Sequence, residues 1–168
     1  MYPKKSMTQV TVRNSSPAAS KRRFQVRRSS VHGRGVFAVA PIARDERLIE
    51  YTGEVIGWPE ALSRHPHDPE DPNHTFYFSL EGGKVIDAKV GGNSSRWINH
   101  ACEPNCQADE ADGRVFIRAL RDLQPGDELF YDYGLVLDER QTAKLKKQYA
   151  CRCGSPSCRG TMLAPKSR

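Results

Sequence analysis

The chain has 168 residues, of which 38% are hydrophobic and 27% are charged. This length suits one domain with a tail better than two independent cores, and the hydrophobic content is enough for a modest core. No apolar run approaches the roughly 20 residues of a membrane span, and the first five residues lack the apolar stretch of a signal peptide. We therefore expect an intracellular protein that makes no membrane contact.

Positive charge is concentrated near the N-terminus. The formal net charge is +6, yet the first 30 residues hold eight basic and no acidic side chains, which leaves 18 basic and 20 acidic groups in the rest of the chain. We expect residues 1–22 to form a basic, disordered tail. The alternative is weak, non-specific contact of residues 1–30 with nucleic acid, because clustered Lys and Arg side chains attract polyanions.

Short strands separated by turns follow the tail, and this pattern predicts a mainly β fold. In chain order we expect strands at 24–28, 35–40, 47–51 and 54–56, a short helix at 59–64, and an exposed loop rich in proline and acidic residues up to residue 74. The runs 76–80 and 84–88 flank Gly82-Gly83 and predict a tight hairpin. Further strands are expected at 114–120 and 128–131.

A longer helix is expected at 137–148. Asp138 and Glu139 would occupy its first turn and Lys144, Lys146 and Lys147 its end, which is the charge order that suits a helix dipole. No phosphate-binding loop or serine nucleophile elbow is present, and the segment 32–37 has only two of the three glycines of a dinucleotide fingerprint.

All five cysteines lie in the second half of the chain, at positions 102, 106, 151, 153 and 158. An odd number without a secretion signal fits a disulfide framework poorly. Three thiols within eight residues, with a Gly-Ser-Pro turn between them, can instead face one metal ion. Structural zinc takes four thiolates, so one further ligand must come from the earlier pair.

Four segments, in order, carry a recurring set of polar and aromatic residues: 32–37 (HGRGVF), 50–54 (EYTGE), 96–106 (RWINHACEPNC) and 128–134 (ELFYDYG). Closed by the three-cysteine segment, this set resembles the SET-domain protein lysine methyltransferases that carry a cysteine-rich post-SET segment. The resemblance spans residues 26 to 163. It implies a SET fold of small curved sheets with a pseudoknot, in which residues 99–102 lie beside residues 131–133.

The resemblance also implies a division of the chain and two bound groups. Residues 23–136 would be the SET domain, and residues 137–168 a C-terminal helix with a zinc-bound post-SET tail. The fourth zinc ligand of the family falls on Cys102, which leaves Cys106 as a packing residue, so the implied ligands are Cys102, Cys151, Cys153 and Cys158. The implied cofactor is S-adenosylmethionine, held by His32, Gly33, Arg34, Gly35, Arg96, Asn99 and His100.

Methyl transfer to lysine requires a neutral amine. At pH 7, deprotonating a lysine of pKa about 10.4 costs about 4.6 kcal/mol, so the site must lower that pKa by desolvation. By resemblance Tyr133 positions the reacting groups, and Tyr131 limits how many methyl groups fit, which favours monomethyl lysine. One departure is Phe76, which stands where many relatives have Tyr.

The expected activity is therefore transfer of a methyl group from S-adenosylmethionine to lysine in a histone tail or another basic protein. A bacterial member would act in the cytoplasm, and one that acts on histones would act on chromatin in the nucleus. The alternatives are a catalytically silent SET-like module that binds a peptide and a zinc-stabilised nucleic-acid binder. The presence of Asn99, His100, Tyr131 and Tyr133 speaks against the silent module, which a methyl-transfer assay would test, and the nucleic-acid binder explains neither the Asn-His nor the Tyr-Asp-Tyr pattern.

Overall fold

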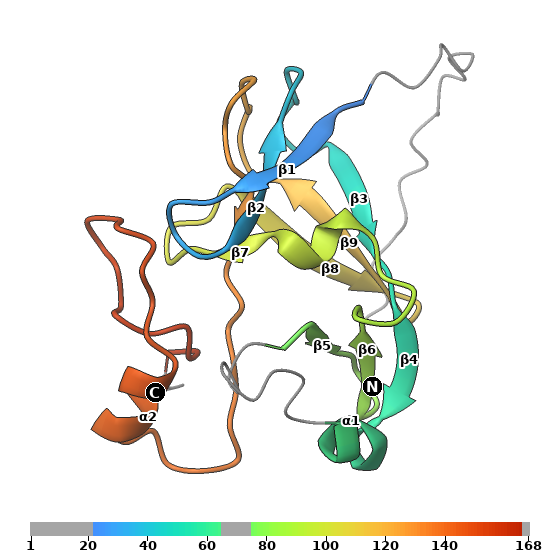
Figure 1. Cartoon of the computed structure of the whole chain (residues 1–168), viewed down its shortest axis with the longest axis vertical. Coiled ribbons are helices and arrows are strands. Elements are labelled where there is room, and N and C mark those ends of the chain that lie inside the picture. Colours follow the sequence, from blue (N-terminus) through green and yellow to red (C-terminus); the bar gives the residue numbers. More distant parts are fainter. Residues whose placement is uncertain (1–21, 65–74, 166–168) are drawn as a thin grey trace, which may run out of the picture.

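A computed structural model of the chain describes residues 22–64 and 75–165. The predicted basic tail up to residue 21 and the predicted loop from residue 65 to 74 lie outside the described residues. Small sheets surround a common core, with α1 on one side and α2 with the C-terminal segment on the other (Figure 1). The helices are α1 (Trp58–Arg64), the 3-10 helix η1 (Ser94–Trp97) and α2 (Ala143–Gln148). The strands are β1 (Phe24–Arg28), β2 (Arg34–Ala38), β3 (Arg47–Tyr51), β4 (Glu54–Gly57), β5 (Tyr77–Ser79), β6 (Lys84–Asp87), β7 (Asn99–His100), β8 (Cys106–Ala111), β9 (Arg114–Ala119) and β10 (Phe130–Tyr131).

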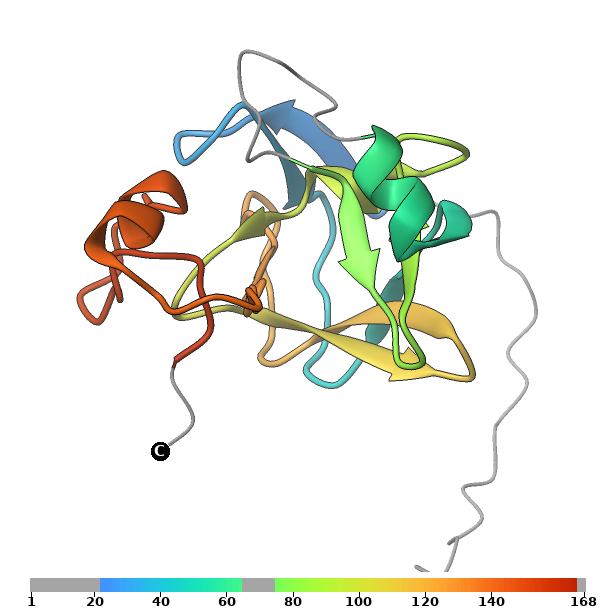
Figure 2. The same ribbon diagram turned by 90° about the horizontal axis from the view of Figure 1, so that it is seen from below.

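The mainly β prediction is confirmed, and the strands form four sheets within the described residues. Two sheets have three strands, in the orders β3-β9-β8 and β4-β6-β5, and two are pairs, β1-β2 and β7-β10. The predicted hairpin joins β5 to β6, and Gly82 and Gly83 both adopt the positive φ that this turn requires. Viewed from below, α2 and the C-terminal segment stand apart from the sheets (Figure 2).

One strand that we did not predict is β8. Its sequence is mostly polar, and only Cys106 in it is buried. The strand pairs with β9 over its whole length and lies at the edge of its sheet. An edge strand needs fewer apolar residues, so periodicity gave no signal there.

The pairing of β7 with β10 builds the centre of the molecule. These strands run parallel, with Phe130 opposite Asn99 and Tyr131 opposite His100, although about 30 residues separate them in sequence. The side chain of Asn105 holds the same region, since its amide donates to the carbonyl of Glu128 at 2.7 Å and accepts from the N–H of Phe130 at 2.8 Å. Residues 99–105 and 128–131 are therefore fixed to one another.

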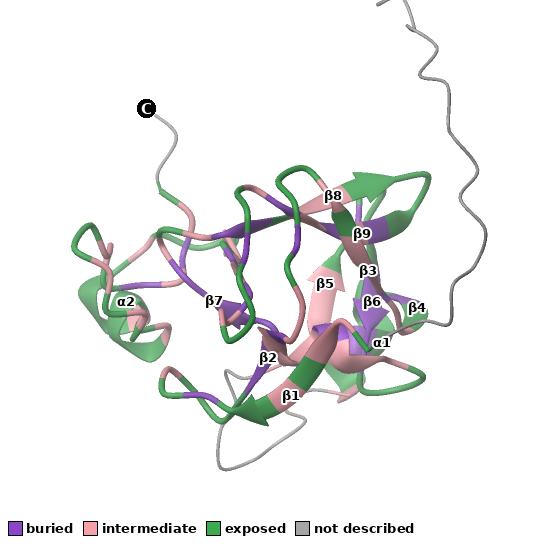
Figure 3. Cartoon of the chain, turned by 90° about the horizontal axis from the view of Figure 1, so that it is seen from above, coloured by how far each residue is buried: buried purple, intermediate pink, exposed green. Residues whose placement is uncertain are grey.

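The main core lies beneath these segments. Its buried side chains come from β2, β8, β9, β10 and the connections between strands, and burial is concentrated there (Figure 3). The fully buried members include Val36, Ile98, Ile117 and Leu129. Removal of such apolar surface from water stabilises the fold by about 25 cal/mol per Å², and it leaves the ends of β7 and β10 rigidly supported.

The prediction for the second helix is wrong at its N-terminal end. The helix α2 begins at Ala143 rather than residue 137, and the Thr142 side chain caps it by accepting from the N–H of Leu145 at 3.2 Å. Of the residues expected to form its first turns, 138 and 139 form a bend, and the Gln141 side chain donates to the carbonyl of Ala164 at 2.9 Å. A contact with the C-terminal segment thus takes the place of the first turns of the expected helix. No helix in the described part of the chain has the length and apolar character needed to cross a membrane.

Candidate functional site

A cavity of about 650 Å³ lies between the sheets and the C-terminal segment. This volume is within the range of about 300–1,000 Å³ that is typical of small-molecule sites. Its walls come from β3, β5, β7, β10, α2 and the segment that follows α2. Several residues singled out from the sequence line it: His32, Arg96, Asn99, His100, Tyr131, Tyr133 and Cys151.

Three residues expected beside the cofactor, Gly33, Arg34 and Gly35, are not among the described residues that line this cavity. The guanidinium of Arg34 lies over the Trp97 ring, 5.1 Å from its centroid. Gly33 has φ +45 with open space around it. These three residues therefore lie outside the described wall of the cavity.

Gly35 leaves room for a carboxylate that the sequence did not reveal. A Cβ built on Gly35 would lie 2.0 Å from Glu128 Oε1. Glu128 accepts hydrogen bonds from the Asn99 amide and from the Ser29 hydroxyl, both at 3.1 Å. The absence of a side chain at Gly35 thus admits the acceptor that orients Asn99.

Asn99 and His100 are both buried on β7, and their side chains are already engaged. The Asn99 amide also donates to the carbonyls of Arg34 at 2.8 Å and His32 at 3.2 Å, which ties β7 to the start of β2. His100 Nδ1 accepts from the N–H of Tyr133 at 3.1 Å, and its Nε2 lies 3.5 Å from Cys102 Sγ. The side chains of Asn99 and His100 therefore hold the segments around the site in place through contacts within the protein.

His100 is a neutral imidazole in this arrangement. Burial lowers its pKa, and an Nδ1 that accepts from Tyr133 carries no proton. The proton is then on Nε2, facing the sulfur of Cys102. The 3.4 Å approach of Asp132 to Nδ1 is for this reason not an ion pair.

Aromatic rings form one wall of the cavity. Tyr131 and Tyr133 lie with ring centroids 4.9 Å apart, Phe78 lies 6.2 Å from Tyr131, and Tyr51 lies 5.4 Å from Phe78. Burial raises the pKa of Tyr51, Tyr131 and Tyr133, so all three phenols stay neutral near pH 7. Phe78, Tyr131 and Tyr133 also line a second cavity of about 280 Å³. The sequence indicated no site role for Tyr51, although segment 50–54 carries part of the resemblance, or for Phe78, which lies in a run expected to form a strand.

Basic side chains also line the cavity, and these fit an anionic ligand group. Arg96 lines the cavity, and its buried Nε has no hydrogen-bond partner among the described residues. Such an orphaned donor is costly unless a ligand satisfies it. Lys147 and Arg152 line the same cavity, and none of its described lining residues is acidic. The carboxylate of an amino-acid-like cofactor such as S-adenosylmethionine fits this basic part of the cavity wall. Phe76 packs edge-on against Trp97 with centroids 5.0 Å apart.

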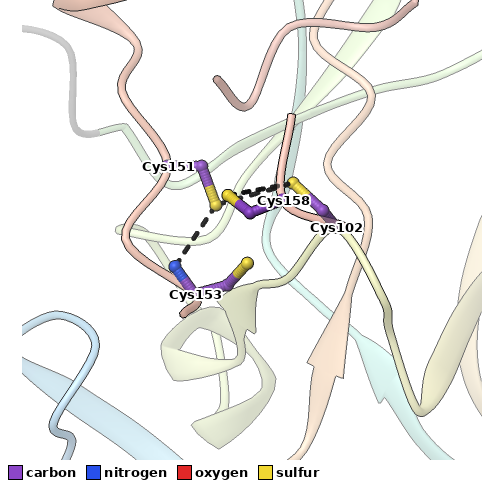
Figure 4. A group of neighbouring side chains, drawn as sticks. All are labelled: Cys102, Cys151, Cys153 and Cys158. Atoms are coloured by element: carbon purple, nitrogen blue, oxygen red, sulfur yellow. Dashed lines mark hydrogen bonds between the residues drawn. The ribbon is translucent and has the colours of Figure 1, made fainter. Parts of the chain in front are cut away.

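The four cysteines of the expected metal site converge (Figure 4). The sulfurs of Cys102, Cys151, Cys153 and Cys158 all lie within 4.8 Å of one another, and Cys102 lies 3.7 Å from Cys151 and 3.9 Å from Cys158. A tetrahedral zinc site with Zn–S bonds of about 2.3 Å requires sulfurs about 3.8 Å apart, so the cluster fits zinc.

Backbone amides support this cluster. The N–H groups of Arg159, Cys153 and Gly160 donate to three of the sulfurs, those of Cys102, Cys151 and Cys158, at 3.3–3.4 Å. Such donors stabilise thiolates around a metal. Cys106 is separate from the cluster: it is fully buried in the main core, and burial raises the pKa of its thiol to about 12. An inert packing role for Cys106 agrees with both observations.

Comparison with known proteins identifies the architecture. The family model of the SET domain matches residues 33–134. The chain belongs to the SET domain family. The match covers β2 through β10 and includes every segment that forms the aromatic wall.

Two relatives show how far the likeness extends. A protein of Kluyveromyces lactis named histone-lysine N-methyltransferase, H3 lysine-4 specific, is 41% identical over 138 residues, which is 79% of this chain and 13% of that protein. The human histone-lysine N-methyltransferase SETD1B is 33% identical over 147 residues, which is 84% of this chain and 7% of that protein. The chain thus spans only a small part of the length of these SET domain relatives.

Proposed function

We propose that this SET domain transfers a methyl group from S-adenosylmethionine to the ε-amine of a lysine in a protein substrate, mainly to the monomethyl state. The observation that carries the proposal is one cavity that combines the basic wall at Arg96 with the neutral tyrosine pair of Tyr131 and Tyr133. A cationic wall suits the amino-acid end of the cofactor, and an aromatic wall suits a lysine side chain.

The cofactor supplies, when bound, a methyl group on a positively charged sulfur. The chain must hold it and orient it. We assign this task to His32, Arg96, Asn99 and His100, with the segment 33–35 shaping the entrance. The positively charged guanidinium of Arg96 would pair with the carboxylate. Asn99 and His100 would act through their backbone, because hydrogen bonds within the protein occupy their side chains.

The aromatic wall would lower the pKa of the substrate lysine. Rings of Tyr51, Phe78 and Tyr131 replace water around the amine, and desolvation lowers a lysine pKa because it penalises the charged form. Tyr133 donates its phenol proton to the carbonyl of Ile98 at 2.7 Å, so its oxygen is left as an acceptor toward the cavity. An acceptor at this position can orient the amine for in-line attack. The released proton passes to solvent.

In this proposal Tyr131 determines how many methyl groups the lysine receives. Its ring is held between Phe78 and Tyr133, and the residue is only 7% exposed. A hydroxyl in so confined a place competes with each added methyl group for space. Monomethyl lysine is then the main product, and dimethyl lysine forms slowly.

The cysteine cluster would hold one zinc ion through Cys102, Cys151, Cys153 and Cys158. Zinc supplies a cross-link there and takes no part in methyl transfer. Three of these ligands belong to the segment after α2, and Cys151, Arg152 and Met162 of that segment line the cavity. Metal binding therefore fastens one wall of the site to the SET domain.

For the substrate we propose a histone tail or another basic protein. The relatives named above are histone-lysine N-methyltransferases, and the two share 33–41% identity with this chain. Action on histones would place the protein on chromatin, and a bacterial member would modify a resident basic protein in the cytoplasm. The basic residues 1–30 would add weak contact with nucleic acid.

The test is methyl transfer by the full chain. Zinc-loaded protein is incubated with tritiated S-adenosylmethionine and either recombinant histone H3 or a panel of basic proteins, and labelled lysines are located by mass spectrometry. We expect labelled monomethyl lysine that is lost in Tyr133→Phe. If the protein binds cofactor and peptide but transfers no label, the chain is a silent SET-like binding module instead.

A further inference from the structure

The cysteine-rich segment that follows α2, which we call the cysteine-rich tail, contacts the segment Tyr131-Asp132-Tyr133 through Arg159. Asp132 is not among the residues that line the main cavity, although both of its neighbours are. Its carboxylate faces Arg159, whose two terminal nitrogens donate to Asp132 Oδ2 at 2.7 Å and Oδ1 at 2.9 Å. This bidentate geometry is the strong form of the Arg–carboxylate pair. Asp132 Oδ1 also accepts from the N–H of Gly134 at 3.0 Å, which fixes the turn after Tyr133.

Arg159 also touches the cysteine cluster. Its backbone N–H donates to Cys102 Sγ at 3.4 Å, and it directly follows Cys158 in sequence. Four thiolates around one zinc ion carry net negative charge, and Asp132 adds a further negative charge nearby. The side chain of Arg159, which is 23% exposed, pairs with Asp132 and is close enough to Cys102 and Cys151 to interact with them electrostatically. Its positive charge therefore offsets the repulsion between these two negative groups.

A second bridge runs beside the first. Cys102 Sγ lies 3.5 Å from His100 Nε2, and His100 Nδ1 accepts from the N–H of Tyr133 at 3.1 Å. The cluster thus reaches the tyrosine segment through the side chain of His100 and through the Arg159–Asp132 pair. His100 is buried in the SET domain, whereas Arg159 belongs to the tail, so only the Arg159–Asp132 bridge depends on how the tail is seated.

We propose that Arg159 is a positioning residue, which couples the seating of the cysteine-rich tail to the placement of Tyr131 and Tyr133 through Asp132. Its effect on rate rests on the proposed methyl transfer, whereas its effect on the tail does not. Coupling is reciprocal, so loss of the Arg159–Asp132 pair must affect both the cysteine-rich tail and the tyrosine segment. The tail should release zinc faster, and the tyrosines should position the amine less well.

The experiment compares Arg159→Gln, Asp132→Asn, the double variant and Arg159→Lys in the full, zinc-loaded chain. The matched control is Arg121→Gln, which breaks another Arg–Asp pair, Arg121–Asp127, that lines neither cavity. The first measurement is the rate of zinc transfer to an excess of a chromogenic chelator. The second is kcat and KM for methyl transfer to a lysine peptide.

We expect Arg159→Gln and Asp132→Asn each to speed zinc release about tenfold, as is typical for loss of a charged hydrogen-bonded pair. The double variant should release zinc no faster than about twice the faster single variant, because both changes break one interaction. The zinc-release rate of Arg159→Lys should lie between those of the wild type and Arg159→Gln, since a lysine keeps the charge but not the bidentate hydrogen bonds. In the transfer assay kcat should fall about tenfold, with the peptide KM changed less than about threefold.

Two results overturn the coupling. One is zinc release within about twofold of wild type in both single variants, and the other is the same acceleration in Arg121→Gln. Asp132→Asn preserves the shape and volume of the side chain, so it still tests the Arg159–Asp132 pair if Arg159→Gln folds poorly. If the wild type transfers no methyl group at all, the proposed function fails, while the zinc-release rates still decide whether Arg159 holds the tail.

Discussion

The hydroxyl of Tyr133 donates a hydrogen bond to the backbone carbonyl of Ile98 at 2.7 Å. Ile98 is fully buried and directly precedes β7, so the phenol is anchored to the most rigid part of the core. Burial, followed by the charge of Glu128, raises the pKa of Tyr133. The phenol therefore acts as a fixed neutral dipole and not as a base.

Tyr133→Phe removes this oxygen while it keeps the ring. We expect methyl transfer to slow by about a hundredfold or more, which corresponds to the few kcal/mol that one positioned polar contact typically contributes. Cofactor affinity, measured by calorimetry, should stay within about threefold of wild type. A variant that turns over at the wild-type rate would show that this hydroxyl does not position the reacting groups.

Tyr131→Phe should change the product more than the rate. The substitution removes a hydroxyl from a buried position and leaves room for a larger alkylamine. Mass spectrometry of a peptide substrate should show a shift from monomethyl toward dimethyl and trimethyl lysine. Ready trimethylation by the wild-type protein would contradict the role assigned to Tyr131.

Cys153→Ser should lose zinc and most of the methyl transfer. Cys106→Ser, the matched control, should spare both because Cys106 lies in the core, away from the cluster. Metal content is measured by atomic absorption, with about one zinc per chain expected for wild type and for Cys106→Ser. Equal loss from the two substitutions would mean that the ligand set is wrong.

A chain that lacks residues 1–20 should keep its turnover on a short peptide. The match to the SET domain begins at residue 33 and the first strand at Phe24, so chemistry should not need the basic tail. Binding to nucleosomes or DNA, measured at two salt concentrations, should weaken if the tail contacts polyanions. A collapse of peptide turnover would place part of the active site in the tail.

The free energy of unfolding should fall as the pH rises into the alkaline range. The pKa of Tyr51, Tyr131 and Tyr133 is raised in the folded state above the ordinary value of 10.0. The unfolded chain ionises these phenols near pH 10 and the folded chain does not, so their contribution is intact below about pH 10 and lost above it. Urea unfolding between pH 8 and 11 measures the decline, and Tyr131→Phe should make it shallower. An unchanged slope in that variant would show that Tyr131 does not contribute to it.

Local patterns in the sequence were enough to predict the hairpin at Gly82-Gly83, the short helix that became α1, and a metal site at the last three cysteines. The choice of Cys102 as the fourth ligand came from the resemblance to the SET-domain family. Local patterns were not enough for β8, whose polar sequence belongs to an edge strand, or for the start of α2, where Gln141 contacts the distant residue Ala164. Glu128 was missed for a similar reason. Its role becomes visible only when Gly35, 93 positions earlier, lies against it.

The division of the cysteine cluster between residue 102 and residues 151–158 affects the order in which the protein is completed during synthesis. The ribosome makes all ten strands of the described chain before it reaches Cys151. Domains generally fold as units, so the last three thiols join a chain in which every strand has already been made. A message that ended before Cys151 would encode every described strand but none of Cys151, Arg152 and Met162, which line the cavity.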